Sequence, residues 1–413
     1  MMKSYDNFLN KIVEQLKCLM NSNEIDGFIK MQNEDLDRVK KVRQTAEDLP
    51  SASFFTEKNR IYIDGLITFA GEKLAAGEYL VFLQNVGQDS IALGEFSLAS
   101  DIYRHVIGKF RKKSNYEDIV AYAYYYLGDI SSRQALWKES FMYIRKAGTL
   151  FARLKDYKGQ AMCENLLGVI YGEKGDLEKA NQHMESSLEM LAQSEDKLLT
   201  ASIENNLGIL NTINGCLENA YTYYCRALTK FEELNEVRRI TEVRHNFGML
   251  FIQKKRYDLA LNELAMSISM ALRERQLSIL GLSYIAKAYI LTQQNDFELA
   301  GAYADKGMEI SYQLNDKLSM ADIYKIKGII HSSKNNYELS ENYLLSSLRL
   351  NRETGNELNY AETSYELGML YLKQNRIKDS KKYLNKAYNY YKKIGKSSEM
   401  LRIQSLKGES EYQ

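Results

Sequence analysis

Glycine recurs in this sequence at intervals of 40 residues, and this regularity restricts the fold more than any other feature. The glycines are Gly128, Gly168, Gly208, Gly248, Gly328, Gly368 and Gly408, and the one position missing from the series holds Ala288. A fixed period of about 20–50 residues is typical of a chain built from copies of one supersecondary unit. Proline occurs only once, at Pro50. Because proline interrupts helices, its scarcity favours helical units.

Three further columns of residues keep the same period. Small residues follow the glycine positions by 12 residues, at Ser140, Ala180, Ala220, Ala260, Ala300, Ser340 and Ser380. A second small-residue column follows by 19 residues, at Ala147, Ser187, Ala227, Ser267, Gly307, Ser347 and Ala387. Large apolar residues follow by 9 residues, at Trp137, Leu177, Leu217, Tyr257, Phe297, Tyr337 and Ile377. Because the distance between packed helices depends on the side chains at the contact, these columns predict a hairpin of two closely packed helices in each unit.

The predicted turn between the two helices carries residues that tolerate a left-handed backbone. These residues are Gly94, Gly175, Gly215, Asn295, Asn335 and Asn375. Glycine, and less often asparagine, ends helices in this conformation. The sequence therefore predicts that each hairpin turn passes through the left-handed region at this point.

The columns resemble those of the tetratricopeptide repeat. Gly168, Tyr171, Ala180 and Ser187 occupy the family's small, aromatic, small and small positions, and the segment 175–180 (GDLEKA) is similar to its commonest turn. The period here is longer than the family's usual length of about 34 residues, and the proline that often ends a unit is absent. The resemblance implies an all-α fold, a right-handed α-solenoid of helical hairpins.

The repeats divide the chain into two predicted regions, 1–79 and 80–413. We place eight units at 80–120, 121–160, 161–200, 201–240, 241–280, 281–320, 321–360 and 361–400, followed by a capping helix in 401–413. Residues 1–79 do not keep the period and are predicted to form helices at about 5–20, 24–47 and 53–77, with a break at Leu49-Pro50-Ser51. They are either an amino-terminal cap, which solenoids need, or a separate effector bundle.

Charge and cysteine content exclude several classes of function. The 55 basic and 54 acidic residues give a net charge of +1, so no direct nucleic-acid binding is expected. The amphipathic amino-terminal helix is interrupted by charged residues, which argues against membrane insertion. The four cysteines are too few and too scattered for a disulfide framework, which predicts a cytoplasmic protein.

No catalytic, metal or cofactor site is predicted, and the protein is not expected to be an enzyme. None of the four histidines has a histidine or cysteine at zinc-ligand spacing. Gly395-Lys396-Ser397 matches the end of a phosphate-binding loop, but the glycine that the motif needs five residues earlier is Tyr390.

The candidate binding residues lie on the predicted first helices of units 3 to 5. In the family that the chain resembles, these helices line the concave side, which implies groove positions at Asn165, Asn205, Asn206, His245, Asn246, Ile209 and Met249. Asparagine offers both a donor and an acceptor, so it can hold the backbone of an extended peptide. Alternatively, these are ordinary polar residues on an exposed face. Arg238, Arg239 and Arg244 are either a solvated cluster or attract an acidic segment.

Two functions remain open at this stage. The first is a scaffold or adaptor that binds a protein segment or peptide in the concave groove. The second is a peptide-responsive sensor in which residues 1–79 act on a transcription or signalling protein, an architecture that resembles the Rap-type regulators of Gram-positive bacteria. End-to-end self-association is a third expectation if a terminal helix leaves an apolar face open.

Overall fold

The computed structural model describes residues 2–44, 51–191 and 196–409, and all regular secondary structure in these ranges is helical. The chain divides into two compact units, 1–123 and 124–413, with the division inside helix α6 (Glu117–Arg133). Each unit is described by itself. The boundary that the repeats suggest, at residue 79, stays a prediction about domain organisation.

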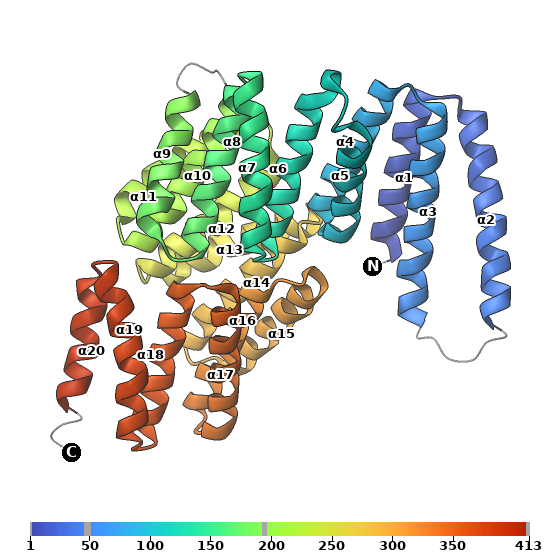
Figure 1. Ribbon diagram of the computed structural model, residues 1–413. Coiled ribbons are helices and arrows are strands. Elements are labelled where there is room, and N and C mark those ends of the chain that lie inside the picture. Colours follow the sequence, from blue (N-terminus) through green and yellow to red (C-terminus); the bar gives the residue numbers. More distant parts are fainter. Residues whose placement is uncertain (1, 45–50, 192–195, 410–413) are drawn as a thin grey trace. The chain divides into compact units, whose positions relative to one another are not determined.

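The amino-terminal unit consists of antiparallel helices that lie alongside one another (Figure 1). They are α1 (Met2–Leu19), α2 (Ser22–Gln44), α3 (Ser51–Lys73), α4 (Ala76–Leu93) and α5 (Phe96–Phe110), with the 3-10 turn η1 (Ser114–Tyr116) before α6. Three helices are thus found where the sequence predicts them in residues 1–79. The predicted break at Leu49-Pro50, and the end of the helix predicted for 24–47, lie outside the described residues.

Apolar side chains and ion pairs join α1 to α4 and α3 to α5. Ile12, Leu16 and Leu66 are completely buried. The Nζ atom of Lys11 lies 2.6 Å from Oδ1 of Asp89, and Nη2 of Arg60 lies 2.6 Å from Oδ2 of Asp101. Residues 1–79 therefore pack directly onto the first predicted repeat.

The larger unit is a series of helical hairpins that begins at α6. Its helices are α7 (Trp137–Leu154), α8 (Tyr157–Glu173), α9 (Leu177–Leu191), α10 (Lys197–Asn214), α11 (Leu217–Glu233), α12 (Val237–Gln253), α13 (Tyr257–Glu274), α14 (Leu277–Gln293), α15 (Phe297–Leu314), α16 (Lys317–Ser333), α17 (Tyr337–Thr354), α18 (Glu357–Lys373), α19 (Ile377–Lys393) and α20 (Ser397–Glu409). The α6–α7 hairpin corresponds to the predicted unit 121–160, and each later hairpin to the next predicted unit.

Left-handed residues recur every 20 positions, at the end of nearly every helix. The glycines and asparagines predicted for the hairpin turns have positive φ, from 59° at Asn375 to 81° at Gly175. Ala135 and Lys255 adopt the same conformation in the other two hairpin turns, and so do the residues between hairpins, Lys155, Asn235, Arg275, Asn315, Gly355 and Gly395. The 40-residue unit is therefore two similar halves, each a helix of about five turns followed by one left-handed residue.

The glycine column allows the two helices of each hairpin to touch, as the sequence predicts. A Cβ atom added at Gly208 would lie 2.5 Å from the ring of Tyr224, and one added at Gly368 would lie 2.6 Å from the side chain of Leu384. Ser140 is completely buried and its hydroxyl donates to the carbonyl oxygen of Gly128 at 2.7 Å. A larger side chain at these positions would force the helices apart.

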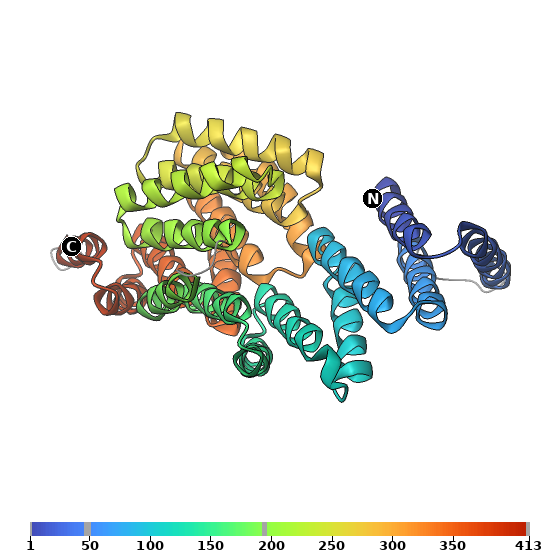
Figure 2. The same cartoon turned by 90° about the horizontal axis from the view of Figure 1, so that it is seen from above.

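The hairpins wind round until late helices of this unit contact early ones, which we call the inter-turn contact. The indole Nε1 of Trp137 donates to the carbonyl oxygen of Thr354, and the amide of Glu357 donates to the carbonyl oxygen of Lys174 at 3.3 Å. The hydroxyl of Tyr390 donates to the carbonyl oxygen of Gly175 at 3.1 Å. In Figure 2 the orange and red helices accordingly return to the green ones.

Candidate functional site

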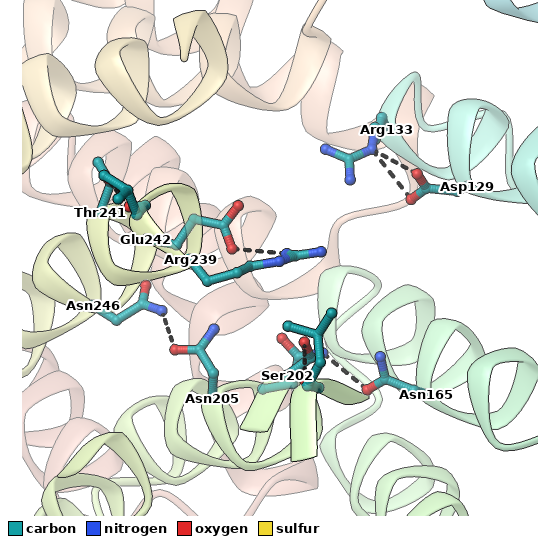
Figure 3. Close-up of polar contacts among 12 residues, drawn as sticks. Asp129, Arg133, Asn165, Ser202, Asn205, Arg239, Thr241, Glu242 and Asn246 are labelled. Atoms are coloured by element: carbon teal, nitrogen blue, oxygen red, sulfur yellow. Dashed lines mark hydrogen bonds and ion pairs between the residues drawn. The ribbon is translucent and has the colours of Figure 1, made fainter. Parts of the chain in front are cut away.

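Four predicted asparagines meet in two side-chain pairs that link successive first helices (Figure 3). Nδ2 of Asn206 on α10 donates to Oδ1 of Asn165 on α8 at 2.9 Å. Nδ2 of Asn246 on α12 donates to Oδ1 of Asn205 on α10 at 2.8 Å. In both pairs the later asparagine lies 41 residues after the earlier one. The 40-residue period therefore brings matched positions of neighbouring units into contact.

The two asparagine pairs differ in their access to solvent. Asn205 and Asn246 are only 7% and 8% exposed, whereas Asn165 and Asn206 are partly exposed. A side-chain amide has two donor hydrogens and an acceptor oxygen. Their mutual bond leaves the Nδ2 group of Asn165 and the Oδ1 atom of Asn206 without a partner among the described residues. One accessible donor group and one accessible acceptor remain at this pair.

The other predicted site residues do not join the pairs. His245 is 7% exposed and its Nδ1 lies 3.0 Å from the hydroxyl of Ser283 on α14. Burial lowers the pKa of the His245 imidazole to about 4, so the ring is neutral at physiological pH. Ile209 packs against the apolar core formed by α10, α11 and α12, and Met249 is exposed.

Two arginines that sequence reasoning did not assign to the site extend toward each other above the asparagines in Figure 3. Nε of Arg133 on α6 lies 3.0 Å from Oδ2 of Asp129, and Nη1 of Arg239 on α12 lies 2.9 Å from Oε2 of Glu242. Asp129 raises the pKa of the Arg133 guanidinium, while burial and the charge of Arg239 lower it. Glu242 raises the pKa of Arg239.

The spacing of residues along α12 would have indicated that Arg239 lies beside the site. Arg239 precedes Asn246 by seven residues, which places the two on one helix face. Arg244, which lies near Arg239 in the sequence, has its Nη1 atom 3.2 Å from Oε2 of Glu263 on the adjacent helix α13.

Carboxylates gather elsewhere in the same unit, near the inter-turn contact. Glu173 ends α8, and burial, followed by the charges of Asp316 and Asp322, raises the pKa of its carboxyl to about 7. Lys325 on α16 lies 3.2 Å from Oδ1 of Asp322 and 2.6 Å from Oε2 of Glu362. The arginines and the carboxylate group thus give the unit two regions of different charge.

Two further properties concern the described part of the chain. None of its helices is long and apolar enough to cross a membrane. Within the same residues, no three histidine, cysteine, aspartate or glutamate side chains lie close enough together to hold a metal ion.

Comparison with known proteins agrees with this architecture. Residues 319–393 match the family model for the tetratricopeptide repeat. Together with the repeated hairpins, this match gives the chain the fold of an all-α right-handed solenoid of tetratricopeptide-type hairpins. A search of curated proteins by sequence finds no match.

Three solved structures share the fold over most of their length. The Rap conjugation gene regulator of the plasmid pLS20, in complex with the Phr* peptide, has a TM-score of 0.57 at 17% identity and covers 96% of this chain and 98% of its own. A Rap protein complexed with Competence and Sporulation Factor has a TM-score of 0.54 at 11% identity and covers 81% and 98%. Aspartyl phosphate phosphatase F from Bacillus subtilis has a TM-score of 0.51 at 13% identity and covers 93% of both chains.

Proposed function

We propose that this protein binds an extended peptide or protein segment along the inner face formed by α6, α8, α10 and α12. The observation that carries the proposal is the pair of asparagine contacts that joins three successive first helices. The Asn165–Asn206 pair leaves one amide donor group and one acceptor for a ligand, and a peptide backbone offers the complementary groups at every residue. Such contacts hold a main chain without depending on its side chains.

The Asn165–Asn206 pair would make the first contact with the ligand. Its Nδ2 group at Asn165 would donate to a ligand carbonyl, and its Oδ1 atom at Asn206 would accept from a ligand amide. The more buried Asn205–Asn246 pair would position α10 and α12 and add contacts where the ligand displaces water. Met249, which is exposed on α12, would provide an apolar surface for a ligand side chain.

The asparagine proposal is tested by a triple variant, Asn205→Ala with Asn206→Ala and Asn246→Ala. We expect capture of the ligand to weaken about tenfold or more, since each lost hydrogen bond contributes about 1 kcal/mol and tenfold corresponds to about 1.4 kcal/mol. Ligands would be identified by affinity capture with mass spectrometry, and binding would then be measured by calorimetry.

The matched control for this experiment is Asn342→Ala, which removes an exposed asparagine from the second helix α17. Circular dichroism would establish that all variants keep their helices. If the triple variant binds as tightly as the wild type, the asparagines do not hold the ligand.

Beyond ligand binding, we propose that the protein is a peptide-responsive regulator rather than a passive scaffold. The structural likeness to a Rap regulator bound to its peptide extends over 96% of this chain, so it includes the amino-terminal helices. In this proposal the peptide binds in residues 124–413 and changes what the first three helices bind, which would be a transcription or signalling protein. A scaffold would bind its partner equally well with and without a short peptide.

Comparing the partners captured by the full chain with and without the bound peptide separates the two functions. Loss or gain of a partner on adding the peptide supports the regulator. If capture is the same in both conditions, the scaffold is the better description.

A further inference from the structure

Positive charge in this chain is concentrated near its carboxyl end. Residues 373–402 contain ten basic side chains and two acidic ones, although the whole chain has 55 basic and 54 acidic residues. The rest of the chain therefore carries a net negative charge. The near-neutral total, from which no nucleic-acid binding was expected, conceals a strongly basic segment that consists mainly of helix α19.

The exposed polar residues of α19 lie along one face of the helix. They recur at spacings of four and three residues, which place side chains on the same side of a helix. These residues, which we call the lysine stripe, are Lys378, Lys382, Asn385, Asn389, Lys392 and Lys393. Because α19 is the second helix of its hairpin, the lysine stripe is not part of the inner face that α6, α8, α10 and α12 form.

Two lysines of the stripe have no carboxylate to pair with. Arg376 holds two nearby carboxylates instead, with its Nη2 atom 2.8 Å from Oδ2 of Asp379 and its Nη1 atom 2.9 Å from Oε2 of Glu341 on α17. Lys378 and Lys392 form no ion pair within the part of the chain that the structure describes. Their charges remain available to an anion outside the chain.

The other two lysines of the stripe have only weak partners. Nζ of Lys393 lies 2.7 Å from Oε2 of Glu357, but the two side chains are 59% and 53% exposed. An ion pair that is so exposed contributes little to stability, so an external anion can replace the carboxylate. Nζ of Lys382 lies 5.5 Å from the centre of the Tyr383 ring.

The lysines form two clusters with uncharged residues between them. Lys378 and Lys382 lie about 19 Å along the helix axis from Lys392 and Lys393, at about 1.5 Å per residue. The two phosphate backbones of duplex DNA border a major groove that is about 12 Å wide, and the phosphates lie behind its edges. The two clusters are therefore placed to contact the phosphates on both sides of one groove, with Asn385 and Asn389 facing the gap.

Other polyanions match the lysine stripe less well. A helix that lies on a membrane buries apolar side chains, and the stripe contains none. A single nucleic-acid strand stacks its bases on open aromatic rings. The ring of Tyr383 instead contacts two lysines and packs against Tyr371, with 5.6 Å between the ring centres. An acidic protein segment presents carboxylates, which arginine forks match best, and the cations of the stripe are all lysine.

From these observations we propose that the lysine stripe of α19 binds duplex DNA through its phosphates. Contacts to phosphates hold a protein on the duplex without reading the base sequence. This activity is separate from the peptide binding proposed above and does not depend on it.

The test measures binding of the full-length protein to a fluorescently labelled duplex of two helical turns, by fluorescence anisotropy over a series of salt concentrations. For the wild type we expect a slope of log affinity against log salt of about −3 to −4, since each phosphate contact contributes about −0.9. The stripe variant should bind at least tenfold more weakly at about 50 mM salt and lose most of this slope. It combines Lys378→Gln, Lys382→Gln, Lys392→Gln and Lys393→Gln.

The matched control removes the same charge from exposed lysines of other hairpins and should bind the duplex as the wild type does. It combines Lys138→Gln, Lys155→Gln, Lys255→Gln and Lys334→Gln. Circular dichroism and thermal unfolding show whether both variants are folded. If the stripe variant does not fold, acetylation of the wild-type lysines with and without duplex takes its place, and the duplex must protect Lys378 and Lys392 but not Lys138.

Three results would overturn the proposal. They are the absence of duplex binding at low salt, an equal loss of binding in the two variants, and stronger binding of another polyanion. The polyanions to compare are polyglutamate, a single DNA strand of the same length and vesicles that contain phosphatidylserine, and each would assign the stripe to a different kind of partner. The asparagine triple variant keeps the lysine stripe, so its result bears on the proposed function alone.

Discussion

At the scale of single residues, His245 shows that a predicted groove position can stabilise the packing between repeats instead of binding a ligand. Its imidazole lies between α12 and α14, where Ser283 contacts both Nδ1 of His245 and the hydroxyl of Ser267. A buried polar network of this kind stabilises the fold only while all its members are satisfied. We therefore assign His245 to the packing of successive repeats, and the asparagines beside it to the proposed site.

The lowered pKa of His245 predicts how stability depends on pH. The unfolded chain takes up a proton near pH 6.5, whereas the folded chain resists protonation until about pH 4. Folded His245 thus contributes to a stability that is complete above pH 6.5 and is lost as the pH falls toward 4, by about 3 kcal/mol at most. The variant His245→Gln keeps a hydrogen-bonding side chain and should lose this part of the pH dependence.

Thermal unfolding of both proteins between pH 4 and pH 7.5 checks this prediction. The midpoint of the wild type should fall more steeply than that of His245→Gln as the solution is acidified. A difference between the two that does not change with pH would show that the imidazole titrates normally.

At the scale of the helical hairpin, the close contact of two helices depends on where glycine lies. Gly208 faces the ring of Tyr224, which is almost completely buried and cannot move aside freely. Gly301 lies inside α15, and a Cβ atom added there would meet nothing within 4 Å. The same substitution should therefore have opposite effects at these two positions.

We predict that Gly208→Ala destabilises the protein by about 1–3 kcal/mol, since the added methyl group must displace the Tyr224 ring. Gly301→Ala should stabilise the protein by about 0.5–1 kcal/mol, because alanine loses less conformational freedom in a helix than glycine does. Chemical unfolding measures both changes. Equal effects at the two positions would contradict the packing that we infer from the glycine column.

Much of the hairpin architecture could be predicted from the sequence, because it depends on local contacts. The glycine column and the two small-residue columns predicted the helix contacts, and Gly175 and Asn375 predicted turns. Ala135 and Lys255 were missed as turn residues because neither favours a left-handed backbone, and their conformation is imposed by the helices on either side. The directions of Arg133 and Arg239 were missed for a different reason, since they depend on how four successive hairpins rotate relative to one another.

At the scale of the larger unit, the inter-turn contact joins residues 217 positions apart, Trp137 and Thr354. Hairpins in a solenoid contact mainly their neighbours, and the path of the whole follows from the small rotation at each step. The repeat pattern in the sequence does not give the rotation from one hairpin to the next. The contact between Trp137 and Thr354, which depends on all of these rotations together, could therefore not be predicted from the sequence.

We predict that Trp137→Phe combined with Tyr390→Phe loosens the inter-turn contact without unfolding the hairpins. Both changes keep an aromatic ring and remove a donor to a backbone carbonyl, which would lower stability by about 1–2 kcal/mol for the pair. Hydrogen exchange of the Glu357 amide, which donates to Lys174 across the contact, should become faster. Tyr383→Phe, on the same helix as Tyr390, is the control, and equal exchange in all variants would show that these two side chains do not hold the turns together.

The inter-turn contact also restricts how this protein can change in length. Most solenoids tolerate the gain or loss of a complete hairpin, because each new copy forms the same junction as the old one. Here the hairpins between α7 and α17 must bring the indole of Trp137 opposite one particular carbonyl group, and deleting or duplicating a copy among them would bring another residue there. Evolutionary or engineered changes in copy number are therefore expected outside the stretch from α6 to α19, where no such alignment has to be kept.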